Sequence, residues 1–115
     1  MTSHAQGLYA EIIAIIYLFL KGYKILKWRF KTTLGEIDIV AEKSGVLVCV
    51  EVKQRAVLNN ALEAVTPFAR QRICRAAKLF VAARPGYFSK SIRFDLIAIS
   101  GLRIQHLDNA WSEAT

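Results

Sequence analysis

The sequence predicts a single α/β domain, residues 1–115, built around a central sheet of four or five strands. Three observations lead to this prediction. The length of 115 residues suits one domain and is too short for two. Apolar residues make up 54% of the chain, which supports a real core and argues against disorder. Hydrophobic patterns follow one another as one helix, three strands, a second helix and two more strands.

The first helix is expected at residues 4–21 and is expected to be buried. Its core is the apolar run IIAIIYLFL, which lies between Glu11 and Lys21, and Gly22 is a suitable C-cap. A membrane-spanning helix needs about 20 such residues. A signal peptide would have basic residues before the run and small cleavage-site residues after it. We therefore expect no membrane partner, and a membrane-surface protein that uses this helix is the weakest of three functional alternatives.

Three strand patterns come next. Residues 23–31 alternate between apolar and basic, which is typical of a strand with one face in water. Residues 36–41 form a short strand that Gly35 opens, and a tight turn joins it to a strand at residues 46–53. The unbroken apolar run at residues 46–50 indicates a central strand in a sheet that is covered on both sides.

The second helix is expected at residues 66–84. Thr66 is a natural N-cap, and Pro67 suits the first turn. Basic residues spread around the rest of this helix. Its apolar stripe consists of Ile73, Ala77 and Phe80.

The remaining segments are a loop and two strands. Residues 55–65 read as a loop with a short helical piece, and residues 85–91 break the second helix. Strands are expected at residues 92–100 and 102–107, around a turn at residues 100–101.

The net charge of +7 favours a polyanionic partner, because the basic residues are concentrated in two segments. The alternative is a solvated surface that favours solubility. The two cysteines, Cys49 and Cys74, lie in apolar stretches, which indicates reduced, buried thiols in a cytoplasmic protein. The two basic segments contain Lys21, Lys24, Lys27, Arg29 and Lys31, and Arg70, Arg72, Arg75, Lys78 and Arg84.

Acidic residues gather where the central strand ends. Glu51 and Lys53 follow the apolar run and point to one face of the strand. Glu36 and Asp38 share a face of the preceding strand, and the hairpin can bring Asp38 beside Glu51. Two close carboxylates resist ionisation unless a cation joins them, and Mg²⁺ prefers such oxygen ligands. The lysine would then stabilise charge at a phosphate or hold the attacking water. The alternative for Lys53 is a plain salt bridge with a carboxylate.

These residues resemble the PD-(D/E)XK nuclease superfamily, and the closer resemblance is to the YraN-like uncharacterised protein family of bacteria (UPF0102). The central motif is Asp38 followed, thirteen positions later, by the EVK of residues 51–53. The resemblance covers nearly the whole chain. The matching stretches are GLYAE (7–11), LKGYKIL (20–26), GEIDIVA (35–41), VCVEVKQR (48–55), ALEAVTP (61–67), RFDLIAI (93–99) and NAW (109–111).

The resemblance implies a restriction-endonuclease-like α/β/α sandwich with a mixed sheet, similar to archaeal Holliday-junction resolvases. It also implies that Asp38 and Glu51 hold Mg²⁺, for which Mn²⁺ can substitute, and that Lys53 is catalytic. Glu11 matches a catalytic glutamate that the first helix contributes in resolvase-like members. Relatives often carry a lysine early in the second helix, where this chain has Ala69. A neighbouring side chain of that helix, Arg70 or Gln71, is the expected substitute.

The leading hypothesis is therefore a cytoplasmic Mg²⁺-dependent endonuclease that hydrolyses DNA phosphodiester bonds, branched or junction DNA included. The alternative is a non-catalytic nucleic-acid-binding accessory protein with a relic nuclease fold. A four-way junction would suit a two-fold homodimer, and no segment of the sequence identifies the interface. The residues expected to bind DNA are Arg55, Arg70, Gln71, Arg72 and Arg75.

Other polar and aromatic residues are given structural roles. Arg93 and Asp95 share a strand face and are expected to pair with each other. His106 has no metal-ligand spacing and receives no role. Trp28 and Phe30 alternate with basic residues, and we expect them to pack in the core in preference to stacking on bases.

Overall fold

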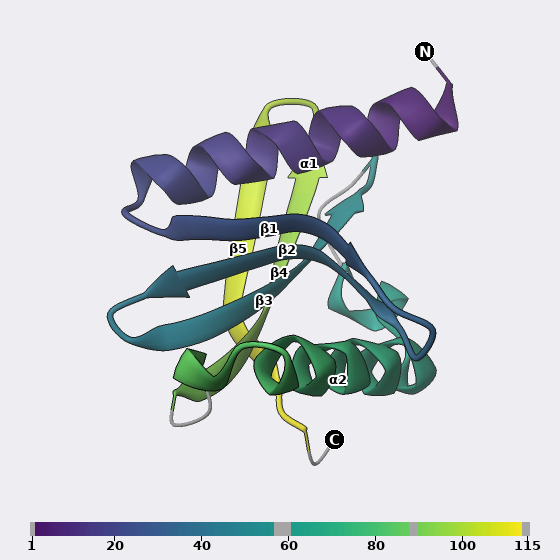
Figure 1. The fold of residues 1–115 in the computed structure, drawn as a ribbon. Coiled ribbons are helices and arrows are strands. Elements are labelled where there is room, and N and C mark those ends of the chain that lie inside the picture. Colours follow the sequence, from purple (N-terminus) through teal and green to yellow (C-terminus); the bar gives the residue numbers. More distant parts are fainter. Residues whose placement is uncertain (1, 57–60, 88–89, 114–115) are drawn as a thin grey trace.

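The computed structural model describes residues 2–56, 61–87 and 90–113, and these form a five-stranded mixed sheet between two helices (Figure 1). The strand order is β1-β2-β3-β4-β5, in which only the β3–β4 neighbours run parallel. The predicted order of elements and the α/β/α sandwich are confirmed. Residues 57–60 of the predicted loop and residues 88–89 of the predicted break lie outside the described residues. The elements are α1 (Ser3–Leu20), β1 (Lys24–Lys31), β2 (Glu36–Lys43), β3 (Val46–Gln54), the 3₁₀ turn η1 (Leu62–Ala64), α2 (Pro67–Ala82), the 3₁₀ turn η2 (Pro85–Tyr87), β4 (Ser91–Ser100) and β5 (Arg103–Trp111).

Strand β3 is the centre of the sheet. It pairs antiparallel with β2 and parallel with β4, in a register that runs from Val46↔Ser91 to Gln54↔Ile99. A parallel pair cannot be joined by a tight turn, so the chain crosses from β3 to β4 through α2. The residues Leu47, Val48, Cys49 and Val50 are wholly inaccessible to solvent, as the unbroken apolar run predicts.

The two helices cover opposite faces of the sheet (Figure 1). On one face, Ile73, Ala77 and Phe80 of α2 pack with Val40 and Cys49. On the other face, the inner side of α1 packs with the alternate strand residues. Cys49 and Cys74 are free, buried thiols, in line with the sequence. The second core contains Ala10, Ala14, Leu18, Ile39, Val48, Val50 and Ile97, among others.

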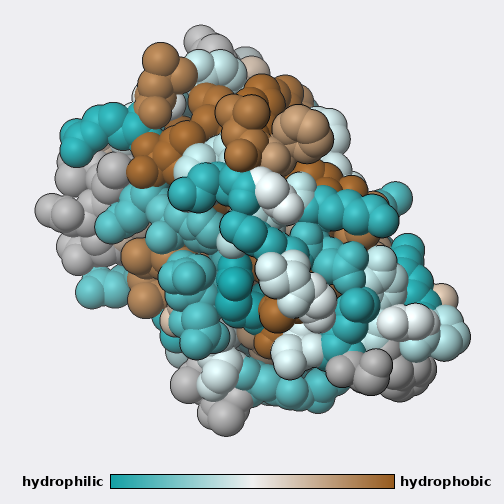
Figure 2. Space-filling view, turned by 90° about the vertical axis from the view of Figure 1, so that its left-hand side faces the viewer, coloured by the Kyte–Doolittle hydropathy of each residue, from teal (hydrophilic) through white to brown (hydrophobic). Residues whose placement is uncertain are grey.

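Helix α1 is buried on one side only, so the prediction of a buried helix holds for its inner side and is wrong for its outer side. Small residues at Ala10 and Ala14 let the helix lie close to the sheet, but no described element packs on its outer side. Figure 2 shows hydrophobic side chains gathered over the end of α1 that faces this view. None of the helices in the described ranges is long and apolar enough to cross a membrane. The outer residues and their exposed fractions are Tyr9 45%, Ile12 45%, Ile16 53%, Phe19 69% and Leu20 76%.

Asp95 of β4 is fully buried and is held by several donors. The predicted pairing with Arg93 is confirmed, because Arg93 donates from Nε and Nη2 at 2.8 and 2.7 Å. His106 Nε2 lies 2.7 Å from Asp95 Oδ2, and the backbone N–H of Asn109 donates at 3.0 Å. In the tautomer that donates from Nε2, His106 Nδ1 accepts from the Tyr17 hydroxyl at 3.2 Å.

This network ties α1 and the start of β1 to the far strands of the sheet. Arg93 Nη2 also donates to the Tyr23 hydroxyl at 2.7 Å. Burial on its own would raise the pKa of Asp95, but the hydrogen bonds from His106, Arg93 and Asn109 outweigh burial and hold that pKa below its ordinary value. The carboxylate therefore stabilises the fold above its ordinary pKa, and this contribution is lost as the pH falls through the lowered value.

We expect Asp95→Asn to lower the free energy of unfolding by about 3 kcal/mol, because the Arg93 guanidinium loses its partner in a largely buried place. The measurement is urea denaturation at neutral pH. Asp108→Asn, at an exposed position of β5, is the control and should unfold at the parent's midpoint. The Asn variant should also lose less stability than the parent on acidification. A shared midpoint for parent and Asp95→Asn would contradict the structural role.

Candidate active site where β2 and β3 separate

The site begins where the β2–β3 ladder ends. The ladder runs from Lys43↔Val46 to Ile39↔Val50, and the next residues along the two strands are Asp38 and Glu51. At this point Asp38 Oδ2 accepts the backbone N–H of Val52 at 2.8 Å. A side chain thus takes the place of a backbone carbonyl, and this bond fixes the Asp38 carboxylate beside β3.

The carboxyl groups of Asp38 and Glu51 interact directly, so the contact expected from the hairpin is confirmed. Burial raises the pKa of Glu51, and hydrogen bonding to Asp38 and the Asp38 charge raise it further, to about 9. Lys53 opposes this shift without cancelling it. The Glu51 side chain is only 14% exposed. In the absence of a cation, Glu51 therefore holds a proton at neutral pH.

Lys53 stands on the same side of β3 as Glu51, as the alternation along the strand predicts. Its Nζ lies 3.6 Å from Glu51 Oε2, which is longer than an ordinary hydrogen bond. The Lys53 side chain is 27% exposed. The ammonium is thus near the acids but is not held tightly by them.

Helix α2 and strands β2 and β3 line a hollow of about 370 Å³ over the acids. A Cβ added to Gly35 would lie 2.1 Å from the backbone oxygen of Arg72, so only glycine allows the β1–β2 turn to pack this closely on the helix. The helix presents Arg72 to the hollow in place of Arg70 or Gln71. Ala69, at the position where the resemblance leads us to expect lysine, also lines it. The full lining is Glu36, Asp38, Glu51, Phe68, Ala69, Arg72 and Ile73.

Glu11 lies in an adjoining hollow of about 220 Å³ on the α1 side, whose lining also includes Asp38. Its carboxylate accepts from Trp28 Nε1 at 2.7 Å and from Arg29 Nε at 2.9 Å. Trp28 is 39% exposed, so its predicted place in the core is wrong, whereas Phe30 packs edge-on against Phe80 as expected. Arg29 has a left-handed backbone conformation, with φ of 57°. This irregularity in β1 lets two consecutive side chains, Trp28 and Arg29, reach Glu11.

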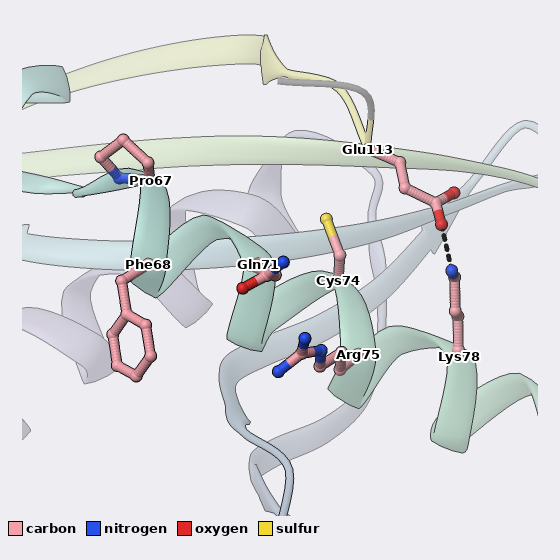
Figure 3. Close-up of a pocket in the computed structure, with 7 residues that line it drawn as sticks. All are labelled: Pro67, Phe68, Gln71, Cys74, Arg75, Lys78 and Glu113. Atoms are coloured by element: carbon pink, nitrogen blue, oxygen red, sulfur yellow. Dashed lines mark ion pairs between the residues drawn. The ribbon is translucent and has the colours of Figure 1, made fainter.

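The residues expected to bind DNA have different surroundings. Arg70 donates to the carbonyls of Val65 and Leu62 at 2.9 and 3.3 Å, so it braces the segment that precedes α2. Arg55 donates to the carbonyl of Gln54. Gln71 and Arg75 are exposed on the outer side of α2 and line a separate hollow of about 660 Å³ (Figure 3).

The acidic pair suits a cation that needs few protein ligands. Within the described ranges, no three His, Cys, Asp or Glu side chains gather closely enough to hold a metal ion, and Glu11 does not join the pair. Mg²⁺ is usually bound through one or two carboxylates, with water and substrate phosphate as its other ligands. Two carboxyls in contact, with the pKa of Glu51 raised by burial and by Asp38, fit that requirement.

The fold and this site define an α/β protein with a mixed sheet between two helices and paired acids at the end of its central hairpin. The chain belongs to uncharacterised protein family UPF0102, whose family model matches residues 10–99. Among similar proteins, the UPF0102 protein of Caulobacter vibrioides strain NA1000 is 47% identical over 109 residues, which cover 94% of this chain and 87% of the relative. That of Caulobacter sp. strain K31 is 49% identical over 107 residues, with 92% and 77% covered. That of Paramagnetospirillum magneticum is 43% identical over 111 residues, with 92% and 86% covered. These names state the family and no activity.

We expect Glu51→Gln to stabilise the metal-free protein. The folded parent keeps a proton that the unfolded chain releases above its ordinary pKa of 4.5, so the parent's free energy of unfolding should fall as the pH rises from 4.5 to about 9. Glutamine mimics the neutral acid, so the variant's free energy of unfolding near pH 8 should exceed the parent's by about 1–3 kcal/mol. The measurement is chemical denaturation in EDTA across this pH range, with the exposed Glu63→Gln as control. The same pH profile for Glu51→Gln and the parent would show that the acids are not coupled as described.

Proposed function

We propose that this protein is a metal-dependent endonuclease that hydrolyses DNA phosphodiester bonds, with Asp38 and Glu51 as the ligands of Mg²⁺ or Mn²⁺. The observation that carries the proposal is the contact between these two partly buried acids, which together with desolvation raises the pKa of Glu51 to about 9. Holding two acids together costs stability, and the single ammonium nearby is too loosely placed to offset it. A divalent cation bound by both oxygens would allow both groups to ionise.

The surrounding side chains suit in-line attack of water on a phosphate. When bound, Mg²⁺ would polarise the phosphate and lower the pKa of a bound water. Lys53 supplies a positive charge for the oxygens of the transition state, and Arg72 offers a second cation from α2. The hydrogen bond from Val52 keeps the Asp38 carboxylate in place before substrate arrives. Water adds to phosphorus and releases a proton to solvent, the bond to the leaving sugar oxygen breaks, and that oxygen takes up a proton from solvent.

DNA is the proposed substrate because the acids stand within a basic protein of net charge +7. Arg29 and Lys31 line the hollow on the α1 side, and Arg72 lines the hollow on the α2 side. Glu11, which borders the first of these hollows, stays a prediction for a supporting site role. The second candidate is a nucleic-acid-binding protein without turnover, and Ala69 at the expected lysine position favours it.

We further propose that the protein forms a two-fold homodimer through the outer face of α1. Its five exposed apolar residues recur at helical spacing and present on the order of 500 Å² of surface. Two copies would bury about 1,000 Å² through these residues alone, which reaches the lower bound for a specific interface. An antiparallel pairing sets the Tyr9 end of one helix against the Phe19 end of the other. This arrangement keeps the two Lys21 ammonium groups apart.

We expect Lys53→Met to abolish most cleavage without harming the fold. Methionine keeps the aliphatic stem and deletes the ammonium, so the rate should fall at least about a hundredfold while DNA binding and melting temperature stay near the parent's. The measurement uses labelled linear, flapped and four-way DNAs with and without Mg²⁺ or Mn²⁺.

If the parent cleaves none of them and still binds DNA, the non-catalytic alternative is favoured. Equal cleavage by parent and variant would remove the role of Lys53, and a large drop in melting temperature would identify a salt bridge.

We expect Ile16→Glu to convert a dimer into a monomer in sedimentation velocity, because a charge enters the centre of the apolar face. Its melting temperature under dilute, monomeric conditions should match the parent's. Leu102→Glu, at an exposed apolar residue of the β4–β5 turn, is the control and should remain dimeric. A monomeric parent would contradict the dimer, and binding of the parent to anionic lipid vesicles through this face would identify a membrane as its partner.

A further inference from the structure

Helix α2 carries a continuous polar and aromatic stripe on its outer side. Phe68, Gln71, Arg75 and Lys78 follow one another at intervals of three or four residues, so they lie on one face of the helix. All four are exposed, and they line the hollow of about 660 Å³ in Figure 3. Lys78 forms an ion pair with Glu113, which reduces its charge, whereas Arg75 faces the solvent. We name these four residues the α2 stripe.

Phe68 is the unusual member of the α2 stripe. Its side chain is 67% exposed, whereas the next residue of the same turn, Ala69, packs against the core. Figure 3 shows the ring projecting from the helix, on the opposite side from Pro67. Thr66 caps this turn by accepting the N–H of Ala69 at 3.1 Å, so the backbone that carries Phe68 is fixed.

The ring of Phe68 also borders the acidic site. Phe68 lines the hollow of about 370 Å³ together with Asp38, Glu51 and Arg72. The Arg72 guanidinium carbon lies over the ring, 5.9 Å from its centroid. The aromatic ring therefore stands between the two acids on one side and the rest of the α2 stripe on the other.

We propose that Phe68 is a stacking platform for an unpaired base beside the cleaved phosphodiester bond, and that the α2 stripe binds the strand that leads away from it. The reference to cleavage rests on the function proposed above. Within a duplex, the faces of a base are covered by its neighbours, so an exposed ring can stack only on a base that has left the helix. The substrate class is accordingly DNA with unpaired nucleotides at the cut, such as a single strand, a flap or a branch point.

The charges of the α2 stripe favour nucleic acid over a protein partner. Arg72 lies over the ring of Phe68, and Arg75 stands two helical turns further along the α2 stripe, so both can contact phosphates. Gln71 offers an uncharged donor and acceptor between Phe68 and Arg75. The stripe runs over the eleven residues 68–78 of the helix, a rise of about 15 Å, which is enough for a short run of nucleotides. An apolar protein anchor would not need a cation over the ring and another along the stripe.

The test is binding of labelled oligothymidylate and of a duplex of equal length, measured by fluorescence anisotropy in EDTA so that cleavage is not required. Phe68→Leu keeps an apolar side chain and removes the aromatic face. We expect it to bind the single strand about tenfold more weakly and to bind the duplex within twofold of the parent. Phe68→Trp should bind the single strand at least as tightly as the parent. Leu102→Ala, another exposed apolar residue, is the matched control and should change neither affinity.

The outcomes separate this inference from the proposed nuclease activity. Equal losses on both DNAs, no loss on the single strand, or the same loss in Leu102→Ala would each overturn the stacking platform. So would a parent that binds neither DNA, which would point to a protein partner for Phe68. A parent that shows the Phe68 dependence but cleaves nothing would leave the platform standing and remove the nuclease.

Discussion

Strand β3 is paired on both edges and covered on both faces, and this burial determines where polar chemistry can stand in the fold. Its parallel partner β4 requires a crossover, which α2 supplies, and its two apolar faces require the two helices as covers. Within the strand, a charged side chain avoids a large desolvation cost only where the helices no longer cover the sheet. Glu51 and Lys53 are placed at that point, and Asp38 enters from β2 at the same level.

The sheet carries acids in two sheltered places, and their surroundings differ. Asp95 receives hydrogen bonds from Arg93, His106 and the Asn109 backbone, and these lower its pKa despite complete burial. Glu51 is partly buried, its neighbours are another acid and an ammonium 3.6 Å away, and its pKa is raised. The surroundings of Asp95 therefore stabilise its charged form, whereas those of Glu51 do not. This contrast supports the proposal that Glu51 is a ligand for a cation.

The features that the sequence predicted well are those encoded within short stretches. The apolar run before Glu51 identified the central strand, and Thr66 with Pro67 marked the start of α2 to within a residue. The hairpin made the Asp38–Glu51 contact predictable, because the two acids are separated by a single tight turn. By contrast, β5 extends to Trp111, beyond the predicted end, since Asn109 adopts a φ of 53° and its N–H binds Asp95.

The features that were missed depend on partners that are distant in sequence. Tyr17 and His106 meet across 89 positions, so no local spacing could reveal the buried network. The choice of Arg72 over Arg70 follows from the rotation of α2 on the sheet, which the close contact between Gly35 and the helix backbone fixes. The exposure of one face of α1 likewise depends on whether another element of the fold covers it. The sequence of the helix alone does not contain this information.

Asp38 borders both hollows, and this shared position bears on how an acidic centre could operate in a protein that is proposed to bind a polyanion. On one side stand Arg29 and Lys31, and on the other stands Arg72. A phosphate that approaches the acids must pass between these cations, whose field offsets the repulsion from the carboxylates at short range. Neutralising the pair with a divalent cation removes the rest of that repulsion and adds a positive charge where the phosphate arrives. In the proposed function, cation binding therefore prepares the site electrostatically for its substrate as well as for the chemistry.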